Sequence, residues 1–143
     1  MIFNKDQREE AVRRIDFIRI QLKDLKQFSN LDWGTYNGDR NVQRNVERLV
    51  ENVANASIDI SKIMIVGEDV EMPNSYRDII LKLGEIGILG PELAKRIAEY
   101  AGFRNILAHE YLDLRWDKIK NFIKNANQDF EDYFAAVLNK IER

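Results

Sequence analysis

The sequence predicts an all-α protein, an antiparallel bundle of about five helices of which two or three are long. Apolar residues recur at three- and four-residue spacing through most of the chain. No segment alternates apolar and polar residues as a half-buried strand does, and only 2 prolines occur in 143 residues. This length and a hydrophobic fraction of 45% predict a single domain, residues 1–143, with its own core.

Capping patterns and turn-forming residues divide the chain into these helices. Polar residues that accept hydrogen bonds from free backbone N–H groups precede most of the apolar runs. The expected helices are one over about 5–28, one from a cap at Asp39 to about Val66, a short one after Ser75, one from Pro91, and a long one after a cap at Asp113. Between the first two helices, Trp33 and Tyr36 are expected to plug the end of the bundle.

Composition argues against several classes of protein. The chain has no cysteine, so neither a disulfide framework nor a cysteine metal site is expected. It has 1 histidine and no clustered carboxylates near it, so we expect no metal and no cofactor. No apolar stretch approaches the roughly 18 residues of a membrane span, and the N-terminus does not resemble a signal peptide, so the expected location is the cytoplasm. The formal net charge of −2 argues against a general nucleic-acid coat, so any RNA is expected to bind in a local basic cleft.

The single histidine, His109, lies in the stretch 101–111, where the sequence points to chemistry. Arg104 stands five positions before it, Asn105 shares its helical face at i and i+4, and Tyr111 follows two positions later. Histidine titrates near neutrality and transfers protons, and arginine presents a planar fork to phosphate oxygens. These residue types suit RNA cleavage through the 2′-hydroxyl, which needs a base, an acid and a cation.

Helical geometry limits what one chain can do with these residues. Arg104 and His109 are about 140° apart around a helix, so a strict helix does not aim both at one atom. Gly102 is a poor interior helix residue and suggests a kink or a close backbone approach. One histidine also leaves either the acid or the base unassigned. A two-fold dimer that brings two such stretches together would supply two His and two Arg.

The pattern Arg104-Asn105-x-x-x-His109-x-Tyr111 resembles the R-x4-H-x-Y motif of the HEPN superfamily, specifically its HepT-like toxins. The run GFRNILAHEY is far more specific than a bare R-x4-H pair, and the likeness extends over 76–119 and, in helix layout, over most of the chain. The resemblance implies a metal-independent endoribonuclease that acts on RNA as a homodimer, with Arg104 and His109 catalytic and Asn105 in the same site. It also implies a type VII-like toxin–antitoxin system, in which a cognate minimal nucleotidyltransferase antitoxin adenylylates Tyr111.

Two other functions stay open on the sequence. One is a catalytically silent HEPN module that binds nucleotide or RNA and serves as the partner of a nucleotidyltransferase. The other is a structural helical adaptor in which the motif residues only tie helix ends together. A stripe of Arg40, Arg44 and Arg48 at i, i+4 spacing is either a solvated face or a contact surface for RNA phosphates or an acidic partner.

Overall fold

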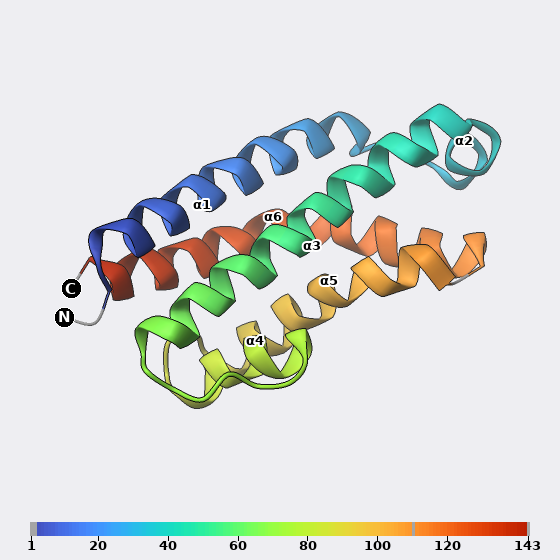
Figure 1. The fold of residues 1–143 in the computed structure, drawn as a ribbon. Helices are drawn as coiled ribbons and strands as arrows, with labels where there is room; N and C mark the ends of the chain where they lie inside the picture. Colours follow the sequence, from blue (N-terminus) through green and yellow to red (C-terminus); the bar gives the residue numbers. More distant parts are fainter. Residues whose placement is uncertain (1–2, 110, 143) are drawn as a thin grey trace.

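The computed structural model is an all-α bundle in the part of the chain that it describes, residues 3–109 and 111–142 with the side chains of 106–109 and 112 excepted. Its elements are α1 (Lys5–Leu25), the 3-10 turn η1 (Lys26–Phe28), α2 (Trp33–Gly38), α3 (Arg40–Gly67), α4 (Tyr76–Glu85), α5 (Pro91–His109) and α6 (Leu112–Ile141). Figure 1 shows the start of α1 and the end of α6 at one end of the bundle, and α2 with the α5–α6 connection at the other. The predicted all-α antiparallel bundle is confirmed.

The long helix α3 is the centre of the packing, because it contacts α1, α4, α5 and α6. Its buried face includes two serines, Ser57 and Ser61, whose small side chains face Tyr133 of α6. The Ser61 and Tyr133 hydroxyls are 2.7 Å apart, and the Tyr133 hydroxyl also donates to the Ser57 carbonyl oxygen at 3.2 Å. Burial raises the pKa of the Tyr133 hydroxyl. The buried polar groups at this crossing therefore satisfy one another.

Residues 33–38 form the short helix α2, which was not among the helices that the sequence predicted. The Asp32 carboxylate supplies a cap, accepting a hydrogen bond from the Thr35 backbone N–H at 2.8 Å. Tyr36 is fully buried, and its ring centroid lies 5.1 Å from that of Trp116. Trp33 stays 39% exposed at the rim. The expected aromatic plug is therefore made by Tyr36 and Trp116, with Trp33 beside them.

The last helix begins earlier than predicted, because Tyr111 and not Asp113 is its N-cap. Tyr111 has an extended backbone (φ −64°, ψ 154°), and its carbonyl accepts the Arg115 N–H at 3.0 Å. The Asp113 carboxylate lies in the first turn and accepts from the Leu114 N–H at 3.0 Å. A negative charge is favourable there as well, since it faces the positive end of the helix dipole. The predicted cap at Asp113 was wrong, and one long helix was right.

Helices α4 and α5 form an antiparallel hairpin that depends on a glycine. A Cβ atom added to Gly84 would lie 2.9 Å from the Cβ of Ala94 and 3.5 Å from the Cα of Pro91. The two helices therefore approach more closely at this point than a side chain on residue 84 allows. The hairpin turn contains Gly87, whose φ of 82° favours glycine. The segment around Gly84, Gly87 and Gly90 is thus a helix–helix turn.

We expect Gly84→Val to lower the free energy of unfolding by about 1–3 kcal/mol, because the new side chain must push Ala94 away. Gly102→Ala is the matched control, since within the described part of the chain a Cβ at that helical position meets the Tyr76 hydroxyl alone, at an ordinary contact distance of 3.7 Å. It should raise the free energy of unfolding by up to about 1 kcal/mol through helix propensity. Urea unfolding followed by circular dichroism measures both. Equal stability changes in the two variants would contradict this account of the hairpin.

Candidate functional site

The predicted site residues lie at the end of α5 and in its connection to α6. This region shares one end of the bundle with α2 and the first turns of α3 (Figure 1). Arg104 and Asn105 are on the last turns of α5, His109 is its last residue, and Tyr111 precedes α6. The motif therefore occupies a helix end and a short connection and not the middle of the bundle.

A buried aromatic cluster sets the rotation of α5 about its axis. Tyr100 and Phe103 are both buried, and their ring centroids lie 5.2 and 5.5 Å from that of Phe122 on α6. Successive residues of a helix advance by about 100°, so the burial of Phe103 turns the next two residues away from the core. Arg104 and Asn105 are accordingly both exposed.

The close backbone approach suggested at Gly102 is not found among the described residues. Helix α5 continues without interruption through this residue to His109. Among the described residues, a Cβ at Gly102 would meet the Tyr76 hydroxyl alone, at an ordinary contact distance of 3.7 Å. The flanking residues Ala101 and Phe103 are buried and hold this part of α5 against the bundle. Because α5 is unbroken, the separation of about 140° around a helix applies to Arg104 and His109 of one chain.

Asn105 is tied to α4, a contact that the sequence did not predict. Its side-chain Nδ2 donates a hydrogen bond to the Tyr76 hydroxyl at 3.0 Å. Tyr76 is the first residue of α4, directly after the N-cap Ser75. The capping pattern at Ser75 gave the start of this helix, but no spacing rule relates its first residue to a position 29 residues later.

The structure describes the other motif residues, Arg104, His109 and Tyr111, to different extents. Arg104 makes no hydrogen bond or ion pair with the residues that the structure describes. The His109 side chain lies outside the described residues, so its separation from Arg104 stays a prediction. Tyr111 is 83% exposed. Arg104, which has no partner among the described residues, and the exposed Tyr111 are both available to a ligand or another protein.

The segment after the motif is anchored by Glu47 of α3. Its two carboxylate oxygens accept from Arg115 Nη1 at 3.2 Å and from the Tyr36 hydroxyl at 2.6 Å. The Glu47 and Arg115 side chains are only 16% and 20% exposed. Burial, and then the hydrogen bond to Glu47, raises the pKa of Tyr36, so this hydroxyl stays protonated and donates. The first turn of α6 is therefore fixed to α2 and α3.

The predicted arginine stripe lies on the outer face of α3. Arg40, Arg44 and Arg48 are all exposed, and none forms an ion pair within the described part of the chain. Glu47, which lies between them in sequence, points inward to Arg115. The stripe occupies the end of α3 that lies near the α5–α6 connection (Figure 1). Both interpretations of the stripe, a solvated face or a contact surface, remain consistent with this geometry.

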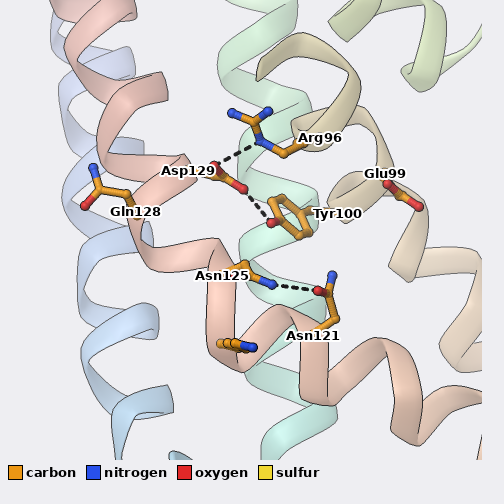
Figure 2. A pocket seen from close by; sticks show the side chains of 8 residues that line it. Arg96, Glu99, Tyr100, Asn121, Asn125, Gln128 and Asp129 are labelled. Carbon is orange, nitrogen blue, oxygen red and sulfur yellow. Dashed lines mark hydrogen bonds and ion pairs between the residues drawn. The ribbon is translucent and has the colours of Figure 1, made fainter. Parts of the chain in front are cut away.

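A polar pocket of about 440 Å³ lies between α5 and α6, apart from the motif residues. Figure 2 shows Arg96 and Tyr100 reaching from α5 to Asp129 on α6. The Tyr100 hydroxyl donates to Asp129 Oδ2 at 2.6 Å, and Arg96 Nε donates to Oδ1 at 3.1 Å. Burial, and then this bond to Asp129, raises the pKa of Tyr100. Asp129 is thus satisfied by the protein, and the network locks α5 to α6.

The described residues offer neither a metal site nor a membrane-spanning helix. No group of three or more His, Cys, Asp or Glu side chains is arranged among them to hold a metal ion. None of their helices is long and apolar enough to cross a membrane.

This helical bundle, with an outward Arg-Asn pair near the end of one helix and an R-x4-H-x-Y pattern, defines a HEPN-type domain. The chain belongs to the ribonuclease HepT-like family, whose model matches residues 18–137. The matched range contains all four motif residues, Arg104, Asn105, His109 and Tyr111, as well as Tyr76.

Two curated relatives resemble the chain over most of its length. A protein of Aphanizomenon flos-aquae named tRNA nuclease HepT is 34% identical, over 87% of this chain and 84% of that protein. A protein of Shewanella oneidensis named mRNA nuclease HepT is 23% identical, over 88% of this chain and 94% of that protein.

Solved structures share the fold. A toxin–antitoxin crystal structure with AMP-PNP aligns with a TM-score of 0.80 at 22% identity, over 90% of this chain and 97% of that chain. A tri-AMPylated Shewanella oneidensis HEPN toxin in complex with an MNT antitoxin aligns with a TM-score of 0.79 at 22% identity, over 94% and 98%. A cytosolic Bacillus subtilis protein of unknown function aligns with a TM-score of 0.80 at 20% identity, over 99% and 94%. At these identities the likeness establishes the fold.

Proposed function

We propose that this protein is a metal-independent endoribonuclease, the toxin of a toxin–antitoxin pair, with Arg104, Asn105 and His109 in its active site. The observation that carries the proposal is the Arg104-Asn105 pair, which the packing of α5 turns outward and which precedes His109 in the family motif. RNA as the substrate is supported by the two relatives, one named a tRNA nuclease and the other an mRNA nuclease.

The proposed reaction uses the RNA's own 2′-hydroxyl as the nucleophile. A base removes the 2′ proton, the 2′-oxygen attacks the adjacent phosphorus, and the 5′-oxygen leaves with a proton from an acid. The products are a 2′,3′-cyclic phosphate and a 5′-hydroxyl. Arg104 would neutralise the phosphate oxygens with its planar fork, and Asn105 would hydrogen-bond to the same group. His109 would transfer the proton.

A homodimer completes this site in our proposal. The chain has 1 histidine, whereas the reaction needs a base and an acid. Helix α5 is unbroken to His109, so Arg104 and His109 of one chain diverge by about 140° around it. Two copies related by a two-fold axis would bring two Arg and two His to one phosphate. Without such a dimer, the same geometry favours the second candidate function, a catalytically silent RNA- or nucleotide-binding module.

We expect the purified protein to cleave RNA in excess chelator and to leave cyclic phosphate ends. His109→Ala and Arg104→Ala should each lower the cleavage rate by about 100-fold or more, the scale of a lost acid–base or charge-stabilising group. Arg13→Ala is the matched control, because Arg13 is an exposed arginine on α1 outside the site. Gel analysis of a labelled RNA measures the rates.

Two results of this assay would contradict the proposal. Equal cleavage by the parent and His109→Ala would assign the activity to a contaminant. A parent that is dimeric, unmodified by intact mass and inactive on tRNA and mRNA would support the silent module.

We propose that the partner is a minimal nucleotidyltransferase antitoxin that adenylylates Tyr111. The tyrosine oxygen would attack the α-phosphorus of ATP, and pyrophosphate would leave. The exposure of Tyr111 supports this role, because an enzyme must reach the hydroxyl. A further support is the fold neighbour described as a tri-AMPylated HEPN toxin with an MNT antitoxin. Adenylate next to His109 would add negative charge where RNA phosphate is expected to bind.

Incubation with the antitoxin and ATP should add adenylate to the parent and abolish its RNA cleavage. Tyr111→Phe removes the acceptor oxygen, so it should gain no adenylate and should go on cleaving RNA with the antitoxin present. Intact mass spectrometry and the cleavage assay on the same samples measure both effects. Modification of Tyr111→Phe to the same extent as the parent would assign the acceptor to another residue.

We further propose that Arg40, Arg44 and Arg48 contact RNA phosphates next to the site. Their exposure and their position at the motif's end of the bundle support this role. Phosphate contacts of this kind supply affinity without sequence preference. We propose a cytoplasmic location, which agrees with the fold neighbour described as cytosolic.

A further inference from the structure

The hydrogen bond between Asn105 and Tyr76 links the motif to a helix outside it. We infer that Tyr76 is a positioning residue of the ribonuclease site, whose hydroxyl holds the Asn105 amide in the orientation that acts on RNA. The inference rests on the proposed function. It assigns a role to α4, which supplies none of the residues of the R-x4-H-x-Y pattern.

The contact restricts a side chain that is otherwise free to rotate. Asn105 is exposed, and an exposed asparagine samples several rotamers unless a partner selects one. Its Nδ2 donates one hydrogen to the Tyr76 hydroxyl at 3.0 Å. An amide has a second hydrogen and an acceptor oxygen, and neither has a partner among the described residues. Tyr76 thus fixes the amide while leaving these groups available to RNA.

Tyr76 is itself held in place by the packing of α4. Its ring is half-buried and packs against the core, and Ser75 caps the helix by accepting the Asp78 N–H at 3.1 Å. One turn later Ile79 is buried as well. At the far end of the hairpin, the close approach of α4 to α5 at Gly84 fixes the spacing of the two helices. The packing of Tyr76 and α4 against the core therefore fixes the position of the Tyr76 hydroxyl.

The site of the contact also argues against a mainly structural role. The hydrogen bond is exposed to solvent, and such a bond contributes little to folding because water replaces it on unfolding. The hairpin has a stronger tie in its buried aliphatic residues and its contact at Gly84. Loss of the hydroxyl should therefore affect the orientation of Asn105 more than the stability of the fold.

The test is Tyr76→Phe, which removes the hydroxyl and keeps the ring. We expect kcat for RNA cleavage to fall roughly tenfold, with KM and thermal stability unchanged. Asn105→Ala should lower kcat at least as much. The double variant should be no slower than Asn105→Ala alone, since Tyr76 acts only through Asn105.

Tyr133→Phe is the matched control, because it removes a buried hydroxyl far from the motif. This hydroxyl contacts Ser57 and Ser61 in the core, so its loss should lower thermal stability and leave kcat unchanged. Tyr76→Phe should therefore lower kcat and keep thermal stability, whereas Tyr133→Phe should lower thermal stability and keep kcat.

The outcomes separate the inference from the function on which it rests. An active parent with unchanged kcat in Tyr76→Phe overturns the inference alone. Losses that multiply in the double variant overturn it too, because Tyr76 would then act independently of Asn105. A dimeric, unmodified parent that cleaves no RNA overturns the proposed function, and the inference falls with it.

Discussion

The packing of Tyr100 and Phe103 against Phe122 is the constraint on which the motif's geometry depends. These rings are buried between α5 and α6, and they fix the rotation of α5 about its axis. A helix rotated by one residue would bury Arg104, which carries a charge that is costly to remove from water. Burying Phe103 therefore both stabilises the bundle and turns Arg104 and Asn105 outward. The exposure of the two residues that the proposed chemistry needs thus depends on which aromatic side chains are buried in the core.

Polar contacts then fix the elements around the motif. The Asp129 carboxylate joins Arg96 and Tyr100 on α5 to α6, and Glu47 joins the first turn of α6 to α2 and α3. Each of these two carboxylates has partners on both of its oxygens, so its partial burial is compensated by hydrogen bonds. Arg104 has no such partner among the described residues. This contrast favours a ligand-binding role for Arg104 over a structural one.

The sequence predicted elements correctly where a pattern of residues repeats along a helix. It failed where a single contact between distant residues determines the structure. Periodic apolar positions gave the long helices, and Asp39 and Ser75 gave the starts of α3 and α4 correctly. The helix α2 is too short for periodicity, and its burial of Tyr36 depends on Trp116, which lies far along the chain.

Three further differences concern single positions. At Gly102, propensity suggested a kink or a close backbone approach, whereas the α-helix continues through this residue between buried neighbours. The sequence placed the cap of the last helix at Asp113, whereas Tyr111 is the N-cap. The contact of Tyr76 with Asn105 joins residues on different helices, which no local rule predicts. The motif residues were identified by the family pattern, and the packing of the core explains why Arg104 and Asn105 are exposed.

The central claim is that two copies of the chain share one catalytic site with two histidines. The most direct measurement is the cleavage rate of an isolated heterodimer of one parent chain and one His109→Ala chain, carrying different affinity tags. A shared site that needs both histidines predicts a rate near that of the His109→Ala homodimer. A rate near half that of the parent dimer would show that each chain works alone, and it would contradict the account.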